Sequence, residues 1–229
     1  MTNHVKIDKK AINKDWKTAF PELEAFGQFK FYEIVGAIII GFELIKLPRI
    51  DAYRPHFVCY PLWKKNIKEC LDVPAILIEI KKSNGGQFSI SLGDHSNQFL
   101  EVVESVRKQI DININGEVLL SDLFILIDNY SQRPPQGAAP NSYLQAKLSE
   151  FKLYCALYTD NANQIQCVLD EIQLKNWDVE HFLLWNVDLK KWLNSLHKTI
   201  LNKDVFLNQI EVNLKDEKIN SLKKNKLLG

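Results

Sequence analysis

Two short clusters hold the residues whose types and spacing could support chemistry. The first is Glu79-Ile-Lys81, an acid and a lysine two residues apart in an apolar run. On a strand this spacing aims both side chains at one face, where an acid can hold a metal ion and a lysine can steady the attacking water. Metal-dependent nucleases use this arrangement with a second acid upstream, a place that Asp72 would fill. A nuclease-like enzyme using Asp72, Glu79 and Lys81 is therefore one candidate function.

A structural interpretation of the same cluster competes with the enzymatic one. Three isoleucines alternate along the run and would take the core face, which leaves Glu79 and Lys81 facing outward. A Glu/Lys pair on the solvated face of an antiparallel strand is common and needs no metal. We therefore expect no metal ion and no other cofactor.

The second cluster is Asp51-Ala-Tyr-Arg-Pro-His56, which places an acid, a phenol, a guanidinium and an imidazole within six residues. The two prolines of segment 48–55 predict a loop that does not pair regularly with a strand. Such a loop is typical of protein-recognition surfaces. The candidate partner-binding residues are Asp51, Tyr53, Arg54 and His56.

Two alternatives for this second cluster remain open. His56 could act as a general base or a metal ligand with Asp51 beside it. In a purely structural role, Tyr53 and His56 would pack under the neighbouring hairpin and Arg54 would pair with Asp51.

The remaining histidines and cysteines suggest no further site. The sequence has no phosphate-binding, dinucleotide-binding, zinc-protease or serine-hydrolase motif. His95 would be exposed at a helix start capped by Asp94, and His181 and His197 have no partner at ligand spacing. The four cysteines form no CxxC pair and are expected to be buried free thiols. We expect no catalytic residues, although the enzymatic alternative stays open.

The helices and strands expected around these two clusters indicate an α+β fold. The N-terminal part should be an antiparallel β-sheet flanked by helices, since alternating and apolar runs are separated by turn residues. Its predicted elements are a helix over Asp8–Phe20, a hairpin over Phe29–Leu47, strands over His56–Trp63, Pro74–Lys82 and Gln87–Leu92, a helix opened by Asp94, and an apolar helix over Asp122–Tyr130 capped by Ser121.

A C-terminal helical bundle is predicted to follow the Pro/Gly-rich segment Ser131–Pro140. We expect two domains, an antiparallel-sheet domain over 1–132 and a helical domain over 141–229 packed against it. The helical domain should contain an αα-hairpin, further helices over Leu189–Leu201 and Val205–Leu214, and a frayed basic tail. A tryptophan stripe, Trp177, Trp185 and Trp192, should serve packing or, where exposed, protein binding.

Composition narrows the classes of partner. The 29 basic and 28 acidic side chains cancel to a net charge of +1, so nucleic acid is not an expected partner. The longest apolar run, Ala37–Phe42, is too short to cross a bilayer, and the N-terminus lacks the apolar stretch of a signal peptide. These features predict a cytoplasmic protein that does not contact a membrane.

Several segments together resemble a family of uncharacterised bacterial proteins. They are Phe20-Pro-Glu-Leu, Val35–Leu44, Tyr53-Arg-Pro-His-Phe, Asp94-His95 and the stretch from Gln209 to Leu228. The family brings no assigned activity and no catalytic residues. Bacterial proteins of this kind are often immunity proteins, so the resemblance implies a protein that binds another protein, namely a cognate toxin, and neutralises it by occlusion.

Overall fold

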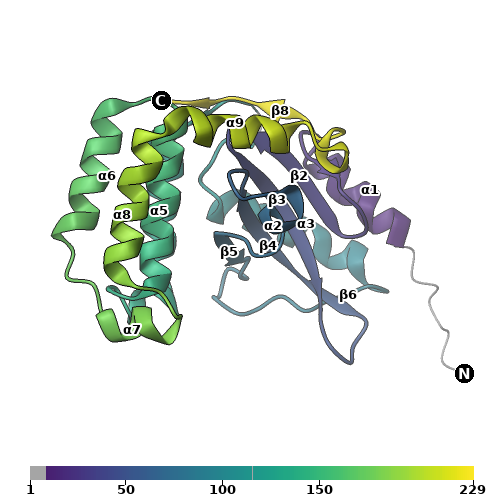
Figure 1. Ribbon diagram of the computed structural model, residues 1–229. Coiled ribbons are helices and arrows are strands. Elements are labelled where there is room, and N and C mark those ends of the chain that lie inside the picture. Colours follow the sequence, from purple (N-terminus) through teal and green to yellow (C-terminus); the bar gives the residue numbers. More distant parts are fainter. Residues whose placement is uncertain (1–8, 115) are drawn as a thin grey trace, which may run out of the picture.

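The computed structural model describes residues 9–114 and 116–229, and it has the predicted α+β fold (Figure 1). The elements of the first half are α1 (Lys9–Ala19), β1 (Glu24–Ala25), β2 (Lys30–Val35), β3 (Ile38–Lys46), β4 (Ala52–Pro61), α2 (Ile67–Cys70), β5 (Ile76–Glu79), β6 (Ile90–Ser91) and α3 (His95–Gln109). Those of the second half are β7 (Val118–Leu119), α4 (Leu120–Ser131), η1 (Gln136–Ala138), α5 (Tyr143–Tyr158), α6 (Ala162–Leu174), α7 (Val179–Leu184), α8 (Leu189–Leu201), α9 (Lys203–Leu214), η2 (Glu217–Ile219), β8 (Lys224–Asn225) and β9 (Leu227–Leu228).

Five antiparallel strands form the centre of the sheet in the order β1-β2-β3-β4-β5. The predicted hairpin is confirmed: β2 and β3 pair from Lys30↔Glu43 to Val35↔Ile38 around a turn at Gly36. The outer edge of β4 is shared, because β5 pairs with its second half and β6 with its start. The predicted strand Gln87–Leu92 is therefore shorter than expected, and it pairs with β4 instead of continuing along β5.

The predicted loop over residues 48–55 is wrong in its second half, because Tyr53, Arg54 and Pro55 belong to β4. Pro55 fits there because its carbonyl accepts a hydrogen bond from Ile80 N at 3.0 Å, on the edge where β5 has already ended. The amide hydrogen that proline lacks would point to that same edge, so the pairing of Pro55 with Leu44 on β3 loses no hydrogen bond.

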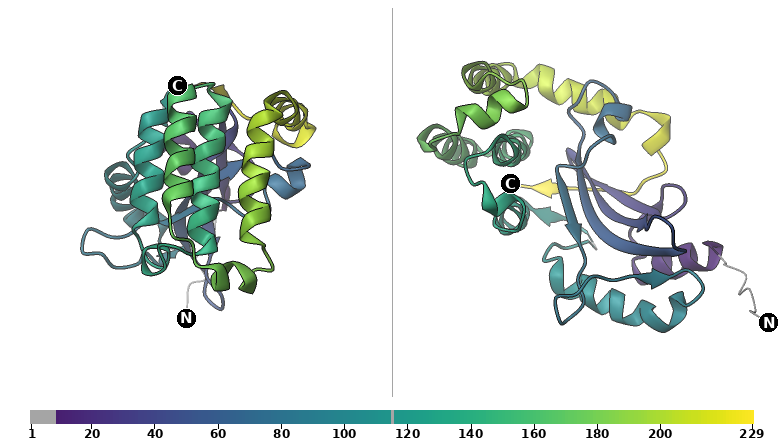
Figure 2. Two further views of the ribbon diagram at one scale, coloured as in Figure 1. Left: turned by 60° about the vertical axis from the view of Figure 1, so that its left-hand side comes forward. Right: turned by 90° about the horizontal axis from the view of Figure 1, so that it is seen from below.

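One face of the sheet forms the core with α1 and α3, which lie together on one side of it in the right-hand view of Figure 2. Trp16 of α1 stacks on Phe31 of the sheet and makes a tilted contact with Phe42. It also meets Phe99 of α3 edge-on, with ring centroids 5.8 Å apart. Three isoleucines of the β5 region are buried on this side, as their alternation predicted: Ile76, Ile78 and Ile80.

The C-terminal half is mostly helical, and α5, α6 and α8 run side by side beside the sheet (Figure 1). The predicted αα-hairpin is confirmed as α5 and α6. Ten of the 16 residues of α5 are buried, which makes it the central helix of this part. Trp177 and Trp192 are buried and Trp185 is half-exposed. Ser121 lies inside α4, whose N-cap position is Leu119, so the predicted cap is displaced.

The predicted frayed tail is wrong, because its residues form the two short strands β8 and β9. Ile34 N donates to Lys223 O at 2.8 Å and Gly36 N donates to Asn225 O at 3.0 Å, so β8 adds a parallel strand beside β2. After one intervening residue, β9 pairs with β7 in a separate two-stranded sheet. The C-terminus therefore joins the first hairpin to the start of α4. In the described part of the chain, no helix is long and apolar enough to span a membrane.

Candidate functional site on the polar face of the sheet

The candidate site is a line of titratable side chains across four neighbouring positions of the sheet. Lys30 on β2, Glu43 on β3, His56 on β4 and Glu79 on β5 are direct cross-strand partners. We call these four residues the polar row. Because alternate residues of a strand point to opposite sides, the row faces away from the core that α1 and α3 cover. The four side chains of the polar row are partly exposed, whereas the apolar residues that flank each of them along its own strand are buried.

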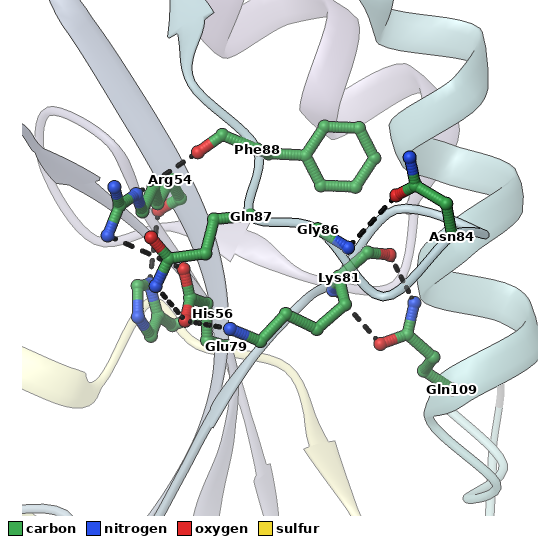
Figure 3. A network of polar contacts seen from close by, with 9 residues as sticks. All are labelled: Arg54, His56, Glu79, Lys81, Asn84, Gly86, Gln87, Phe88 and Gln109. Carbon is green, nitrogen blue, oxygen red and sulfur yellow. Dashed lines mark hydrogen bonds and ion pairs between the residues drawn. The ribbon is translucent and has the colours of Figure 1, made fainter.

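Glu79 holds one end of the polar row together (Figure 3). Its Oε2 accepts hydrogen bonds from Lys81 Nζ at 2.5 Å and from Gln87 Nε2 at 3.1 Å. Arg54 Nη1 lies 3.6 Å from its Oε1, which has no hydrogen-bond donor among the described residues. Burial alone would raise the pKa of Glu79, but Lys81, Gln87 and Arg54 lower it below the ordinary value. This carboxylate is therefore ionised and faces two cations.

Glu43, near the other end of the polar row, is likewise surrounded by hydrogen-bond donors. Tyr32, Tyr60 and Lys30 all donate to its Oε1, Tyr60 at 2.6 Å and Lys30 at 3.1 Å. Burial would raise the pKa of Glu43, but these three donors lower it below the ordinary value. Burial and then the hydrogen bond to Glu43 raise the pKa of both phenols, so the tyrosines stay neutral donors.

His56 lies between the two carboxylates and is held by the backbone of its own strand. Its Nδ1 is 3.2 Å from Arg54 O, and a carbonyl can only accept, so Nδ1 carries the proton in the neutral ring. Burial lowers the pKa of His56 by more than the hydrogen bond to Arg54 O and the nearby carboxylates raise it. The neutral ring keeps Nε2 as an acceptor, which has no partner among the described residues.

The structure separates the four residues predicted to bind a partner. Arg54 and His56 belong to the polar face, and Arg54 Nε also donates to Phe88 O at 3.1 Å (Figure 3). Asp51 lies in the loop before β4 and pairs with Lys46 at 3.4 Å, not with Arg54. Tyr53 points to the opposite face and is fully buried. Only two of the four residues therefore share one accessible surface with Glu79 and Lys81.

Tyr53 belongs instead to a buried chain of hydrogen bonds. Trp16 Nε1 donates to its hydroxyl at 3.3 Å, and the hydroxyl lies 2.8 Å from His95 Nδ1. His95 Nε2 in turn lies 3.2 Å from Asp15 Oδ2. The expected exposure of His95 is wrong, since only 4% of this residue is accessible. The carboxylate of Asp94 accepts from the side chains of Asn97 and Gln98 and makes no capping bond to a backbone amide.

The three residues of the nuclease hypothesis do not all come together. Glu79 and Lys81 share one face and form an ion pair, as the spacing predicted. Asp72 follows α2, where its backbone N donates to Glu69 O, and none of the contacts of the described residues joins it to Glu79 or Lys81. Within residues 9–114 and 116–229, no three His, Cys, Asp or Glu side chains are grouped as metal ligands.

The cysteines, His181 and His197 lie outside the polar row. Cys59, Cys70 and Cys155 are buried free thiols as expected, but Cys167 is exposed. Tyr143 N donates to His181 Nδ1 at 3.1 Å, and His197 contacts Gln173 at 3.2 Å. Neither histidine lies beside the polar row.

Sequence reasoning missed half of the site: Lys30, Tyr32, Glu43, Tyr60 and Gln87. The signal that could have found Glu43 is an acid in the otherwise apolar run of β3, opposite Lys30 on β2. As a whole the polar face offers fixed opposite charges and one neutral imidazole. Such a surface suits recognition by complementary charge.

Comparison with known proteins finds no family model, no curated protein and no solved structure that matches this chain.

Proposed function

We propose that this protein binds another protein and neutralises it by occlusion, in the manner of an immunity protein that covers a cognate toxin. The observation that carries the proposal is the polar row, with Arg54 and Lys81 at one end of it. The protein would act in the bacterial cytoplasm without a cofactor.

The polar face has the composition of a protein-binding surface. Its charged groups are held in place by one another, so little conformational entropy is lost when a partner orders them. Ile45 and Leu77 project on the same side and are 37% and 40% exposed, which adds apolar area beside the charges. An arginine next to apolar side chains is a frequent centre of binding energy. This face therefore replaces the predicted Asp51–His56 loop as the proposed contact.

The experiment is co-expression with the product of the adjacent reading frame. If that product is a toxin, cells should survive only when this protein is present, and the two should co-purify. The variants Arg54→Ala and Lys81→Met should reduce both protection and co-purification. If a complex forms but neither variant weakens it, the surface assignment is wrong and the immunity function stands. If neither protection nor a complex is found, the function itself is wrong.

A metal-dependent nuclease is the second candidate, and one observation favours it. Glu79 Oε1 is buried without a hydrogen-bond donor among the described residues, as an unused ligand atom would be. A thermal-shift titration with Mg²⁺ and Mn²⁺ tests this candidate, because a metal that binds the native state raises the melting temperature. The nuclease hypothesis predicts a shift that disappears in Glu79→Gln, together with nicking of plasmid DNA that is lost in Lys81→Met. The immunity proposal predicts neither effect.

A further inference from the structure

A cavity of about 510 Å³ lies where α8 meets α9, away from the polar row. Its floor is aromatic: Trp63 follows β4, Tyr154 belongs to α5 and Phe206 belongs to α9. The polar side chains at its rim are Lys198, Thr199, Asn202 and Gln209. Small-molecule sites in proteins have this size and this mixture of an apolar lining with a few polar groups.

The three floor rings contact one another at interplanar angles of 40°, 51° and 89°. Trp63 and Tyr154 are perpendicular with centroids 5.5 Å apart, while Phe206 lies 5.9 Å from Trp63 and 5.3 Å from Tyr154. A flat apolar group placed against such rings can stack on one of them and meet another edge-on, both of which are favoured aromatic geometries. The floor therefore favours an aromatic ring over an aliphatic chain.

The charge of the residues at the rim determines whether a cation or an anion suits the cavity. Among the described residues that line the cavity, Lys198 is the only charged one and none carries a carboxylate. Lys198 is exposed, and its ammonium forms no ion pair with any of the described residues. An ammonium beside an apolar floor is complementary to a ligand that carries one negative charge.

The hydrogen-bonding groups of the cavity include donors that an anion can use. Three other tryptophans donate their indole N–H to an acceptor, namely Trp16, Trp177 and Trp192. The indole N–H groups of Trp63 and Trp185 make no hydrogen bond with the described residues, and both side chains are at least partly exposed. The amides of Asn202 and Gln209 are each oriented by one bond to a backbone carbonyl, at 2.7 and 3.2 Å, which leaves a second N–H on each.

We infer that this cavity binds a small aromatic carboxylate, whose ring lies on the Trp63, Tyr154 and Phe206 floor and whose carboxylate is held by Lys198. The inference is independent of the polar face and of any protein partner.

The test is a titration of the ¹⁵N-labelled protein with phenylacetate, followed through the indole N–H signals of its five tryptophans. The Trp63→Phe variant assigns the Trp63 signal by removing it. Phenylacetate should shift this signal saturably at millimolar concentration. Phenylacetamide, which lacks the charge, and cyclohexylacetate, which lacks the aromatic ring, should each bind at least roughly tenfold more weakly.

Matched variants separate the cavity from general anion binding. Lys198→Met keeps most of the side-chain stem and should weaken phenylacetate roughly tenfold, since a charge-assisted hydrogen bond is lost. Lys190→Met removes an exposed lysine from the same helix outside the cavity and should leave the affinity unchanged. The inference is overturned if phenylacetate leaves the Trp63 signal in place, if the amide binds equally well, or if Lys198→Met has no larger effect than Lys190→Met.

Discussion

At the residue scale, the buried hydroxyl of Tyr53 ties α1, β4 and α3 together. It accepts from Trp16 and donates to His95 Nδ1, which leaves the Nε2 proton of the neutral ring for Asp15. Tyr53→Phe should lower the free energy of unfolding by about 1–3 kcal/mol, because it leaves a buried donor and a buried acceptor unpaired. Urea denaturation measures this loss.

The matched control for Tyr53 is Tyr143→Phe. Tyr143 is half-buried, and its hydroxyl makes no hydrogen bond with the described residues, so its loss should change stability by less than about 0.5 kcal/mol. Because Tyr53 faces the core, Tyr53→Phe should also leave partner binding intact. Equal stability of the two variants would show that the chain of hydrogen bonds contributes nothing.

Glu33 is a second residue whose burial has a measurable consequence. It is fully buried on β2, its Oε2 accepts from Asn225 Nδ2 at 2.5 Å, and its Oε1 has no partner among the described residues. Burial raises its pKa to about 7, although the bond from Asn225 acts in the opposite direction. The folded protein therefore keeps a proton on Glu33 at pH values where the unfolded chain has lost it.

The sign of the resulting pH dependence follows from this proton. Glu33 makes its full contribution to the free energy of unfolding below pH 4.5, which is its pKa in the unfolded chain. This contribution is lost as the pH rises through about 7, its pKa in the folded protein. The loss should reach up to about 3 kcal/mol. Glu33→Gln, which resembles the protonated acid, should remove this loss when unfolding is measured between about pH 5 and pH 9. A variant that loses as much stability as the natural protein over that range would refute the assignment.

At the scale of elements, the turn of the first hairpin is where the two halves meet. A Cβ on Gly36 would lie 2.6 Å from Tyr158 Cε1 and 2.8 Å from Leu227 Cβ. Gly36→Ala should therefore cost about 3 kcal/mol, from both the contact and its φ of +55°. Gly85→Ala is the control, since its φ is +80° but its Cβ would meet nothing within 4 Å. It should cost only about 1 kcal/mol in urea unfolding. Equal costs would mean that Gly36 is needed for its backbone conformation alone.

The elements that were predictable from the sequence are those with a clear local period. The β2–β3 hairpin, the alternating isoleucines near β5 and the α5–α6 pair all follow from local pattern. The β8 strand was not predictable, because two residues carry no period and its partner Ile34 lies almost the whole chain away. The paired Pro55 was missed because its tolerance depends on where β5 ends, which is a tertiary fact. The polar row was missed for the same reason, since cross-strand register is not visible in one strand.

At the scale of the whole molecule, the C-terminus and α9 hold the helical region against the sheet. Asn213 of α9 donates to Leu62 O and Lys64 O, both at 2.7 Å, and β8 adds to β2. The polar row and the aromatic cavity therefore belong to one framework but to separate surfaces. A partner that covers the polar face and a small carboxylate in the cavity should bind independently of one another.

The most direct test of the proposed function is the affinity of the purified protein for the toxin domain encoded beside it, measured by isothermal titration calorimetry. Arg54→Ala and Lys81→Met should each weaken binding roughly tenfold or more, because each removes a charge from the polar face. Lys190→Met and Tyr53→Phe should retain the natural affinity. If Arg54→Ala and Lys81→Met bind as tightly as the natural protein, the assignment of the polar face as the contact is contradicted, and if no binding occurs at all, the proposed function is contradicted.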